Sequence, residues 1–159
     1  MPAGAEGLLF LPYLAGERSP HMNPDARGAW LGLTLAHDRR HLTRALLEGV
    51  GFALRDCLLR MRELGLRPER LTLTGGGSKS AFWRSLLASQ LDVELAGAAN
   101  ADGPALGAAM LAGVGAGLFP DLAAAVTACV RPPIFRAPPD PKLASPWSGG
   151  SRPTTVKRA

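Results

Sequence analysis

The spacing of hydrophobic residues divides the chain into short stretches that suit strands and longer stretches that suit helices. The strand-like stretches alternate or run continuously and are bounded by glycine, proline and polar residues. The expected strands are residues 7–14, 29–35, 70–74 and 93–95. The helix-like stretches repeat their apolar residues every three or four positions. The expected helices are residues 39–64, a segment that ends near residue 91, residues 105–115 and residues 121–129.

The longest of these helices has clear signals at both ends. Asp38 can accept hydrogen bonds from the first free N–H groups, and Gly65 allows the backbone to leave the helix. Glu48 stands among apolar residues of this helix, so it is either a paired structural carboxylate or part of an exposed stripe. Farther along, the order of strand, helix and strand between residues 70 and 95 predicts a crossover unit, and the fold class is therefore α/β.

The glycine triplet after the third expected strand is the most informative feature for chemistry. Gly75, Gly76 and Gly77 carry no Cβ, so a ligand can approach their backbone closely, and Ser78 or Ser80 can cap the helix that follows. Free N–H groups at such a helix start hold anions or polar rings. The spacing is neither that of a Walker A loop nor GxGxxG, and a tight turn can need glycine without a ligand. From these residues alone, nucleotide binding and a purely structural turn both remain open.

The net charge of +5 arises entirely at the end of the chain. From residue 131 onward there are six basic residues and one acid, whereas residues 1–130 carry twelve of each sign. No aromatic residues interleave with the basic ones, so we expect no nucleic-acid binding. Seven of the fourteen prolines fall in the last 29 residues. We therefore expect one domain at residues 1–130 and a disordered, core-free basic tail at residues 131–159.

Cysteine, histidine and hydropathy patterns exclude several classes of protein. Cys57 and Cys129 are too few for a disulfide framework or a CxxC metal site. The three histidines, at positions 21, 37 and 41, are expected at the surface, so we predict no metal site. The N-terminus lacks a signal pattern, and the apolar stretch 105–118 is too short and too rich in glycine to span a bilayer. We expect a cytoplasmic location and no membrane partner.

Four segments, in order, resemble the FGGY carbohydrate kinases, and the resemblance extends over residues 2–130. The segments are residues 7–21, residues 25–33 with 41–49, residues 74–84, and residues 102–112. The first is most similar to the form in the xylulokinase subfamily. The chain departs from the family at Ser85 and Asp102, where Gln and Glu are usual, and after Phe135, where the basic end looks like a truncated or frameshifted closing helix.

The resemblance implies a ribonuclease H-like, or actin-like ATPase, lobe: a mixed sheet flanked by helices, incomplete at both ends. It implies ATP and Mg²⁺ as cofactors, with Mg²⁺ held mainly through the other lobe. Gly75, Gly76 and Gly77 would form backbone surface for adenosine and ribose, and Ser80 would add a polar contact. Family members keep the catalytic aspartate and the sugar-binding residues mainly in the amino-terminal lobe. We therefore expect no catalytic residue here and no activity from this chain alone.

The implied function is phosphorylation of D-xylulose to D-xylulose 5-phosphate, with ATP and the sugar as partners. One alternative is another FGGY sugar kinase such as gluconokinase, from which only the loop at residues 12–21 separates the chain. The other is a non-catalytic nucleotide-binding or interface module, whose exposed apolar surface would favour a homodimer.

Side chains near the glycine triplet and in the first loop have competing roles. We expect Lys79 to be solvated rather than bound to phosphate, and Trp83 to pack its helix on the sheet rather than stack on adenine. Glu17, Arg18 and His21 either line a cleft between lobes or form a local ion pair and turn.

Overall fold

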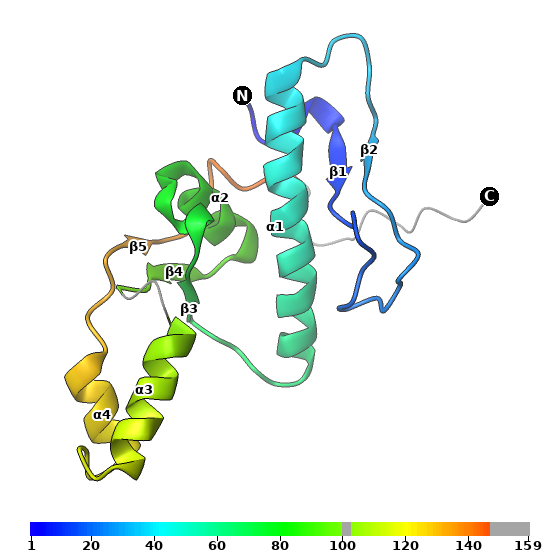
Figure 1. Ribbon diagram of the computed structural model, residues 1–159. Coiled ribbons are helices and arrows are strands. Elements are labelled where there is room, and N and C mark those ends of the chain that lie inside the picture. Colours follow the sequence, from blue (N-terminus) through cyan, green and yellow to red (C-terminus); the bar gives the residue numbers. More distant parts are fainter. Residues whose placement is uncertain (100–102, 147–159) are drawn as a thin grey trace.

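The computed structural model describes residues 1–99 and 103–146, and its fold is mixed α/β (Figure 1). A 3₁₀ turn at Ala5–Gly7 is followed, in chain order, by β1 (Leu9–Leu11), β2 (Ala29–Leu31), α1 (Arg39–Glu63), β3 (Arg70–Leu73), a 3₁₀ turn at Gly76–Lys79, α2 (Ala81–Leu91), β4 (Glu94–Gly97), α3 (Gly103–Gly115), α4 (Leu122–Cys129) and β5 (Arg136–Ala137). The order of strands and helices agrees with the order predicted from hydrophobic spacing up to residue 129. The unit β3–α2–β4 is the predicted crossover, because β3 and β4 are parallel.

Two small sheets flank the long helix α1. The first is an antiparallel pair of β1 and β2, in which Phe10 stands opposite Trp30 with ring centroids 4.5 Å apart. The second has the order β3–β4–β5. Both strands of the first sheet are shorter than expected. Pro12 directly after β1 has no N–H to donate, and Gly32 directly after β2 adopts a positive φ of 85° that an extended strand does not use.

The start of α1 is held by a reciprocal cap. The Asp38 carboxylate accepts hydrogen bonds from the N–H groups of Arg40 and His41, and the Asp38 N–H donates to His41 Nδ1 at 3.0 Å. Hydrogen bonds from the Arg40 side chain, and then from His41, hold the pKa of Asp38 well below its usual range. Burial of His41 in this cap corrects the expectation that all three histidines lie at the surface.

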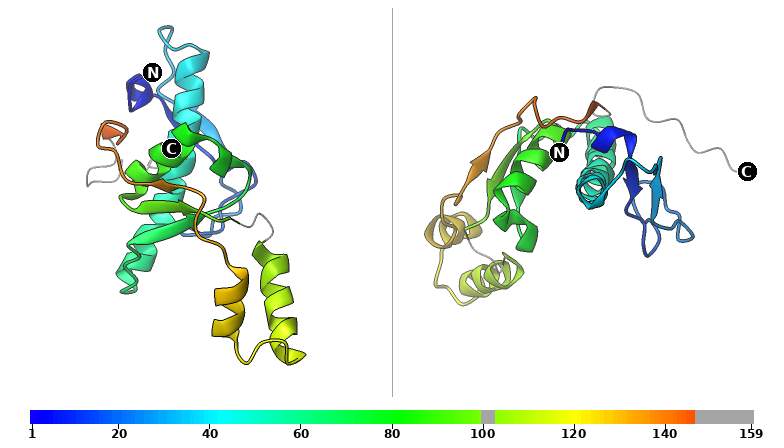
Figure 2. Two further views of the ribbon diagram at one scale, coloured as in Figure 1. Left: turned by 90° about the vertical axis from the view of Figure 1, so that its left-hand side faces the viewer. Right: turned by 90° about the horizontal axis from the view of Figure 1, so that it is seen from above.

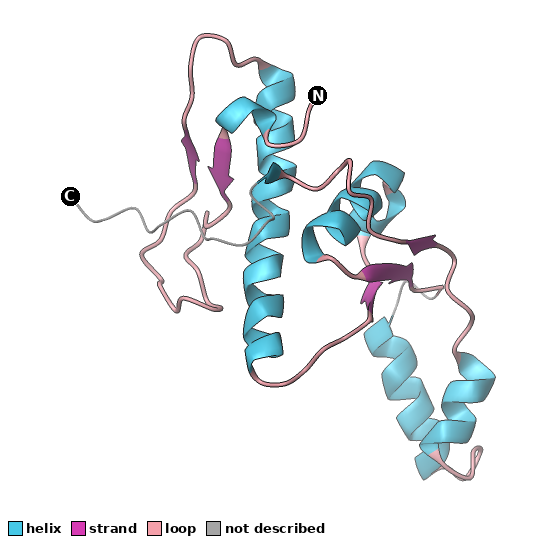
Figure 3. Ribbon diagram, turned by 180° about the vertical axis from the view of Figure 1, so that it is seen from behind, coloured by secondary structure: helices cyan, strands magenta, loops and turns pink. Residues whose placement is uncertain are grey.

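Helix α1 approaches its neighbours at two glycines. A Cβ built on Gly49 would overlap the Phe10 carbonyl oxygen of β1, and one built on Gly51 would overlap the Gln90 side-chain amide of α2. Gln90 Nε2 in turn donates to the Glu48 carbonyl at 3.1 Å. In Figure 3, α1 stands between the first sheet and the α2 side of the molecule. The contact with β1 therefore needs a residue without a side chain, because the overlapped atoms are backbone, whereas the contact at Gly51 is with the end of a side chain.

A buried ion pair lies next to these contacts. Arg44 Nε is 2.6 Å from Glu48 Oε1, both residues are buried, and the Gly4 N–H donates to the same oxygen at 2.9 Å. The Arg44 guanidinium also lies 5.4 Å from the ring centroid of Phe82, on the first turn of α2. Of the two roles left open for Glu48, the paired structural carboxylate is confirmed.

The segment after residue 131 contributes to the core, so the expectation of a core-free tail is wrong for its described part. Strand β5 pairs with the edge of β4, and Ala137 joins the core cluster of Leu87, Leu91 and Leu95. The Phe135 ring occupies the space left by the missing side chain of Gly97. The many prolines after residue 131 did not prevent strand β5 from forming, because a strand of two residues needs only the unpaired edge of β4 to form its hydrogen bonds. The expected disorder of residues 147–159 falls outside the described residues.

We predict that Gly49→Ala destabilises the protein by about 1–3 kcal/mol, because the new methyl group meets the rigid backbone of β1 rather than a movable side chain. Urea unfolding followed by circular dichroism measures the change. Gly107→Ala in α3 is the matched control: a Cβ there meets nothing within 4 Å, so the exchange improves helix propensity and leaves the protein as stable or more so. Equal behaviour of the two variants would contradict the proposed close approach.

Candidate functional site

The glycine triplet forms an exposed turn between β3 and α2. Gly75, Gly76 and Gly77 are all exposed, and Gly76 starts the 3₁₀ turn that leads towards α2. Gly75 has φ 84° and ψ −178°, a conformation open in practice only to glycine. The backbone conformation therefore requires glycine at position 75. For this one residue, the explanation of the triplet as a purely structural turn holds.

The other two glycines differ in what surrounds them. A Cβ on Gly76 would meet no atom within 4 Å, whereas one on Gly77 would lie 3.1 Å from Trp83 Nε1. Gly76 also lacks a positive φ. Neither local sterics nor backbone conformation requires glycine at position 76, so its bare backbone faces open space that a ligand can enter.

Hydrogen bonds within the turn set the start of α2. The Ser78 N–H and its hydroxyl both donate to the Gly75 carbonyl, at 3.1 Å and 2.7 Å. Ser80, rather than Ser78, caps the helix: its Oγ accepts from the Trp83 N–H at 3.2 Å. This bond uses the oxygen of Ser80 as an acceptor and leaves the hydroxyl proton free to be donated to a ligand.

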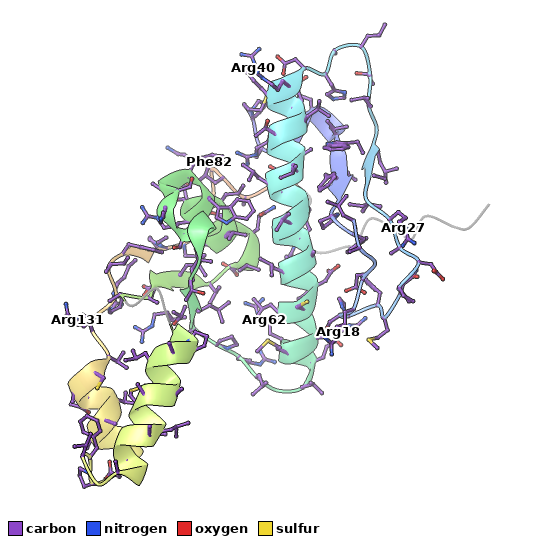
Figure 4. The ribbon with its side chains drawn as sticks, viewed as in Figure 1. Arg18, Arg27, Arg40, Arg62, Phe82 and Arg131 are labelled. Atoms are coloured by element: carbon purple, nitrogen blue, oxygen red, sulfur yellow. The ribbon has the colours of Figure 1, made fainter. Side chains whose placement is uncertain are left out.

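The neighbouring side chains take the roles that the sequence favoured. Trp83 is half-buried and packs against the core cluster of α2, β4 and β5, which confirms its packing role. Lys79 is exposed. Phe82 lies on the same first turn of α2, where Figure 4 shows it beside α1. The contact of Arg44 with Phe82 was not predicted from the sequence; the only local signal for it was the i, i+4 spacing of Arg44 and Glu48.

The polar loop at residues 16–25 folds on itself and on α1. Glu17 and Asn23 exchange two backbone hydrogen bonds of 2.8 Å, and the Glu17 carboxylate accepts from the His21 N–H at 2.7 Å. His21 Nε2 lies 3.7 Å from the Asp56 carboxylate of α1. Burial raises the pKa of Tyr13, and the charges of Asp56 and Glu17 add to that rise. Of the two roles left open for Glu17, Arg18 and His21, the local turn is present at Glu17 and His21.

A small hollow between this loop and α1 is separate from the glycine turn. It is lined by Pro20, His21, Asp56, Leu59 and Arg60, and its volume of about 30 Å³ suits a water molecule rather than a nucleotide. Within residues 1–99 and 103–146, no three His, Cys, Asp or Glu side chains gather as metal ligands, and no helix is both long and apolar enough to cross a bilayer. Asp102, one of the two positions at which the sequence departs from the family pattern, lies outside the described residues.

Comparison with known proteins identifies the family. Residues 2–116 match the family model described as "FGGY family of carbohydrate kinases, C-terminal domain". The chain is 49% identical to the xylulose kinase of Escherichia coli strain K12 over 116 residues, which are 70% of this chain and 23% of that protein. The chain thus spans about a quarter of the length of the curated relatives it matches.

Solved structures give the same answer for the fold. The ligand-bound xylulose kinase from Lactobacillus acidophilus superposes with a TM-score of 0.81 at 34% identity, covering 89% of this chain and 29% of that chain. The gluconate kinase from the same organism superposes with a TM-score of 0.80, also at 34% identity. This match covers 89% of this chain and 28% of the gluconate kinase chain. The mixed sheet and its flanking helices are therefore those of the actin-like ATPase fold of these kinases, and the chain belongs to the FGGY family of carbohydrate kinases, within their C-terminal domain.

Proposed function

We propose that this chain is the nucleotide-binding, C-terminal part of an ATP-dependent kinase that phosphorylates D-xylulose to D-xylulose 5-phosphate. The proposal rests on Gly76: a glycine that its own surroundings do not require, at an exposed turn before a capped helix. It is supported by the family and by the similarity to xylulose kinases at 49% and 34% identity. A ligand that needs close access to the backbone explains a glycine in this place.

The residues of the turn would bind the donor rather than carry out chemistry. The backbone of Gly75, Gly76 and Gly77 offers a surface without side chains on which adenine and ribose can lie. The Ser80 hydroxyl can donate its free proton to a polar atom of the nucleoside. Phosphoryl transfer depends chiefly on positioning, so a fixed donor site is a substantial contribution. ATP, when bound, supplies the γ-phosphoryl group, and we assign no catalytic residue to this chain.

The rigidity of this site would come from the buried pair on α1. Glu48 fixes Arg44 at 2.6 Å, and Arg44 lies against Phe82 on the first turn of α2. The turn that would hold the nucleoside directly precedes this helix, so its position depends on α1 as well as on β3. Mg²⁺, which the family implies, finds no cluster of three ligands among the described residues, and we propose that the other lobe of the kinase holds it.

A gluconate kinase is the second candidate, and one observation favours it. The gluconate kinase and the xylulose kinase from Lactobacillus acidophilus superpose on this chain with TM-scores of 0.80 and 0.81 at equal identity. The fold of this part therefore suits either sugar. We favour xylulose because the loop at residues 12–21 has the xylulokinase form and because the relative at 49% identity is a xylulose kinase.

We predict that Gly76→Ala weakens ATP binding by tenfold or more while the stability of the chain is unchanged, since its Cβ would occupy the nucleoside surface and touch no protein atom. Isothermal titration calorimetry with MgATP measures the affinity, and urea unfolding measures the stability. Gly75→Ala is the contrasting variant, because the positive φ of Gly75 makes it lose stability as well. Unaltered affinity in Gly76→Ala would remove the turn as the nucleotide site.

Ser80 allows its two roles to be separated by the choice of replacement. Ser80→Ala loses the cap and should cost about 1 kcal/mol of stability. Ser80→Asp keeps the cap but cannot donate a proton, so we expect near-normal stability together with ATP affinity lowered by several-fold. Ser80→Thr retains both functions and is the control. If Ser80→Asp binds ATP as tightly as the unmodified chain, Ser80 is a cap and has no nucleotide contact.

The choice of sugar can be tested with two matched hosts. Residues 2–116 would replace the corresponding segment in the Lactobacillus acidophilus xylulose kinase and in its gluconate kinase, which match this chain equally well. We expect the chimera in the xylulose kinase to retain at least tenfold more of its host's kcat/KM than the chimera in the gluconate kinase, because the exchanged segment includes the loop at residues 12–21, whose form resembles that of the xylulokinases. Better retention in the gluconate kinase would reverse the ranking of the two sugars.

A further inference from the structure

The two ends of the Trp83 side chain have different surroundings. The ring packs against the core cluster of α2, β4 and β5. The edge that carries the nitrogen lies against the glycine turn: a Cβ built on Gly77 would be 3.1 Å from Trp83 Nε1 and 3.2 Å from its Cδ1. The half-buried indole thus reaches from the core to the backbone of Gly77.

The indole N–H of Trp83 has no acceptor among residues 1–99 and 103–146. The hydrogen bond that Trp83 donates to a side chain comes from its backbone N–H, which bonds to Ser80 Oγ at 3.2 Å. A tryptophan that is partly buried normally pairs its N–H, and this group can only donate. The nitrogen edge of Trp83 is therefore a free donor directed at the exposed turn.

Ser80 brings a second donor to the same place. Its backbone N–H donates to the Gly77 carbonyl at 3.2 Å, so both Ser80 and Trp83 contact Gly77. The two residues are three positions apart at the start of α2, a spacing that puts side chains on one side of a helix. The Ser80 hydroxyl proton and the Trp83 indole proton are thus two donors beside one stretch of bare backbone.

The chemistry of the two donors indicates which part of a nucleotide they suit. Neither the hydroxyl nor the indole carries a charge. Phosphate oxygens form their strongest hydrogen bonds with charged donors such as arginine, whereas neutral donors are adequate for hydroxyl oxygens and ring nitrogens. The ribose and the base of a nucleoside offer acceptors of the latter kind.

We propose that Trp83 Nε1–H donates a hydrogen bond to an acceptor atom of the nucleoside, so that Trp83 contributes to nucleotide affinity as well as to packing. The inference rests on the proposed function and adds a second side-chain contact to the same site. It differs from stacking on adenine, because the ring faces stay in the core and only the nitrogen edge meets the ligand. Trp83 is a binding residue with no part in the chemical step.

Trp83→Phe removes the indole N–H and keeps an aromatic ring. We expect the Kd for MgATP to rise about three- to tenfold, the usual effect of one lost hydrogen bond. Calorimetry on the full chain measures the Kd, and urea unfolding follows any loss of packing. Trp30→Phe is the matched control, because Trp30 lies on β2, which is on the other side of α1 from α2 in the right-hand view of Figure 2. This control should bind MgATP as tightly as the unmodified chain.

Nuclear magnetic resonance observes the N–H itself in the unmodified chain. The indole ¹⁵N–¹H signal of Trp83 is assigned by its absence from the spectrum of Trp83→Phe. We expect this signal to move downfield during a MgATP titration, with the same Kd as the amide signal of Gly76. The indole signal of Trp30 should stay in place.

Adenosine and its analogues separate the possible acceptors. Adenosine has no phosphates, so the weaker binding of Trp83→Phe should persist with adenosine. 2′-Deoxyadenosine and 3′-deoxyadenosine each lack one ribose acceptor, and 3-deazaadenosine and 7-deazaadenosine each lack one acceptor of the base. For the analogue that lacks the bonded atom, Trp83→Phe should cause no further loss of affinity, which assigns the contact to the ribose or to the base.

Three results would overturn the inference and leave the proposed nucleotide site standing. The Gly76 amide signal moves with MgATP while the Trp83 indole signal does not; Trp83→Phe binds MgATP as tightly as the unmodified chain; or the loss is seen with MgATP and is absent with adenosine. If the unmodified chain binds no MgATP by calorimetry or by resonance, the nucleotide site itself is refuted, and the contact of Trp83 is refuted with it.

Discussion

The close approach of α1 to its two neighbours is the constraint on which the rest of the structure depends. Gly49 meets the backbone of β1 and Gly51 meets the side chain of Gln90 on α2. A methyl group at position 49 would overlap the backbone of β1, so α1 can approach β1 this closely only at a residue without a side chain; at position 51 the overlap would be with the end of the Gln90 side chain. Leu58 of the same helix then reaches the core cluster built on α2, β4 and β5.

The buried pair of Arg44 and Glu48 extends this constraint to the proposed nucleotide site. An ion pair taken out of water does not by itself add stability, but removal of one partner is costly because the other charge stays buried. Its geometric consequence is clear in this chain: Glu48 holds Arg44, Arg44 lies against Phe82, and Phe82 stands on the first turn of α2. The Ser80 cap and the glycine turn directly precede that helix.

The described chain has two outward surfaces of opposite character. The glycine turn exposes backbone and a hydroxyl proton, which suit a polar ligand of modest size. The α3–α4 hairpin exposes leucine and valine, which suit an apolar protein surface. This contrast follows from position: the turn lies between β3 and α2 and packs on α2, whereas α3 and α4 pack mainly on each other.

Hydrophobic spacing and local chemistry by themselves determined the order of the elements up to residue 129, the crossover β3–α2–β4, the Asp38 cap of α1 and the place of the glycine turn. These features depend on neighbours within a few residues, which a sequence displays directly. Only the tertiary structure decided that Ser80 rather than Ser78 is the cap, that His41 and Glu48 are buried, and that Phe135 and Ala137 complete the sheet. It also separated Gly75, which its backbone conformation requires, from Gly76, which faces open space. The physical reason is that burial and free space are properties of residues brought together from distant parts of the chain, and no local pattern records them.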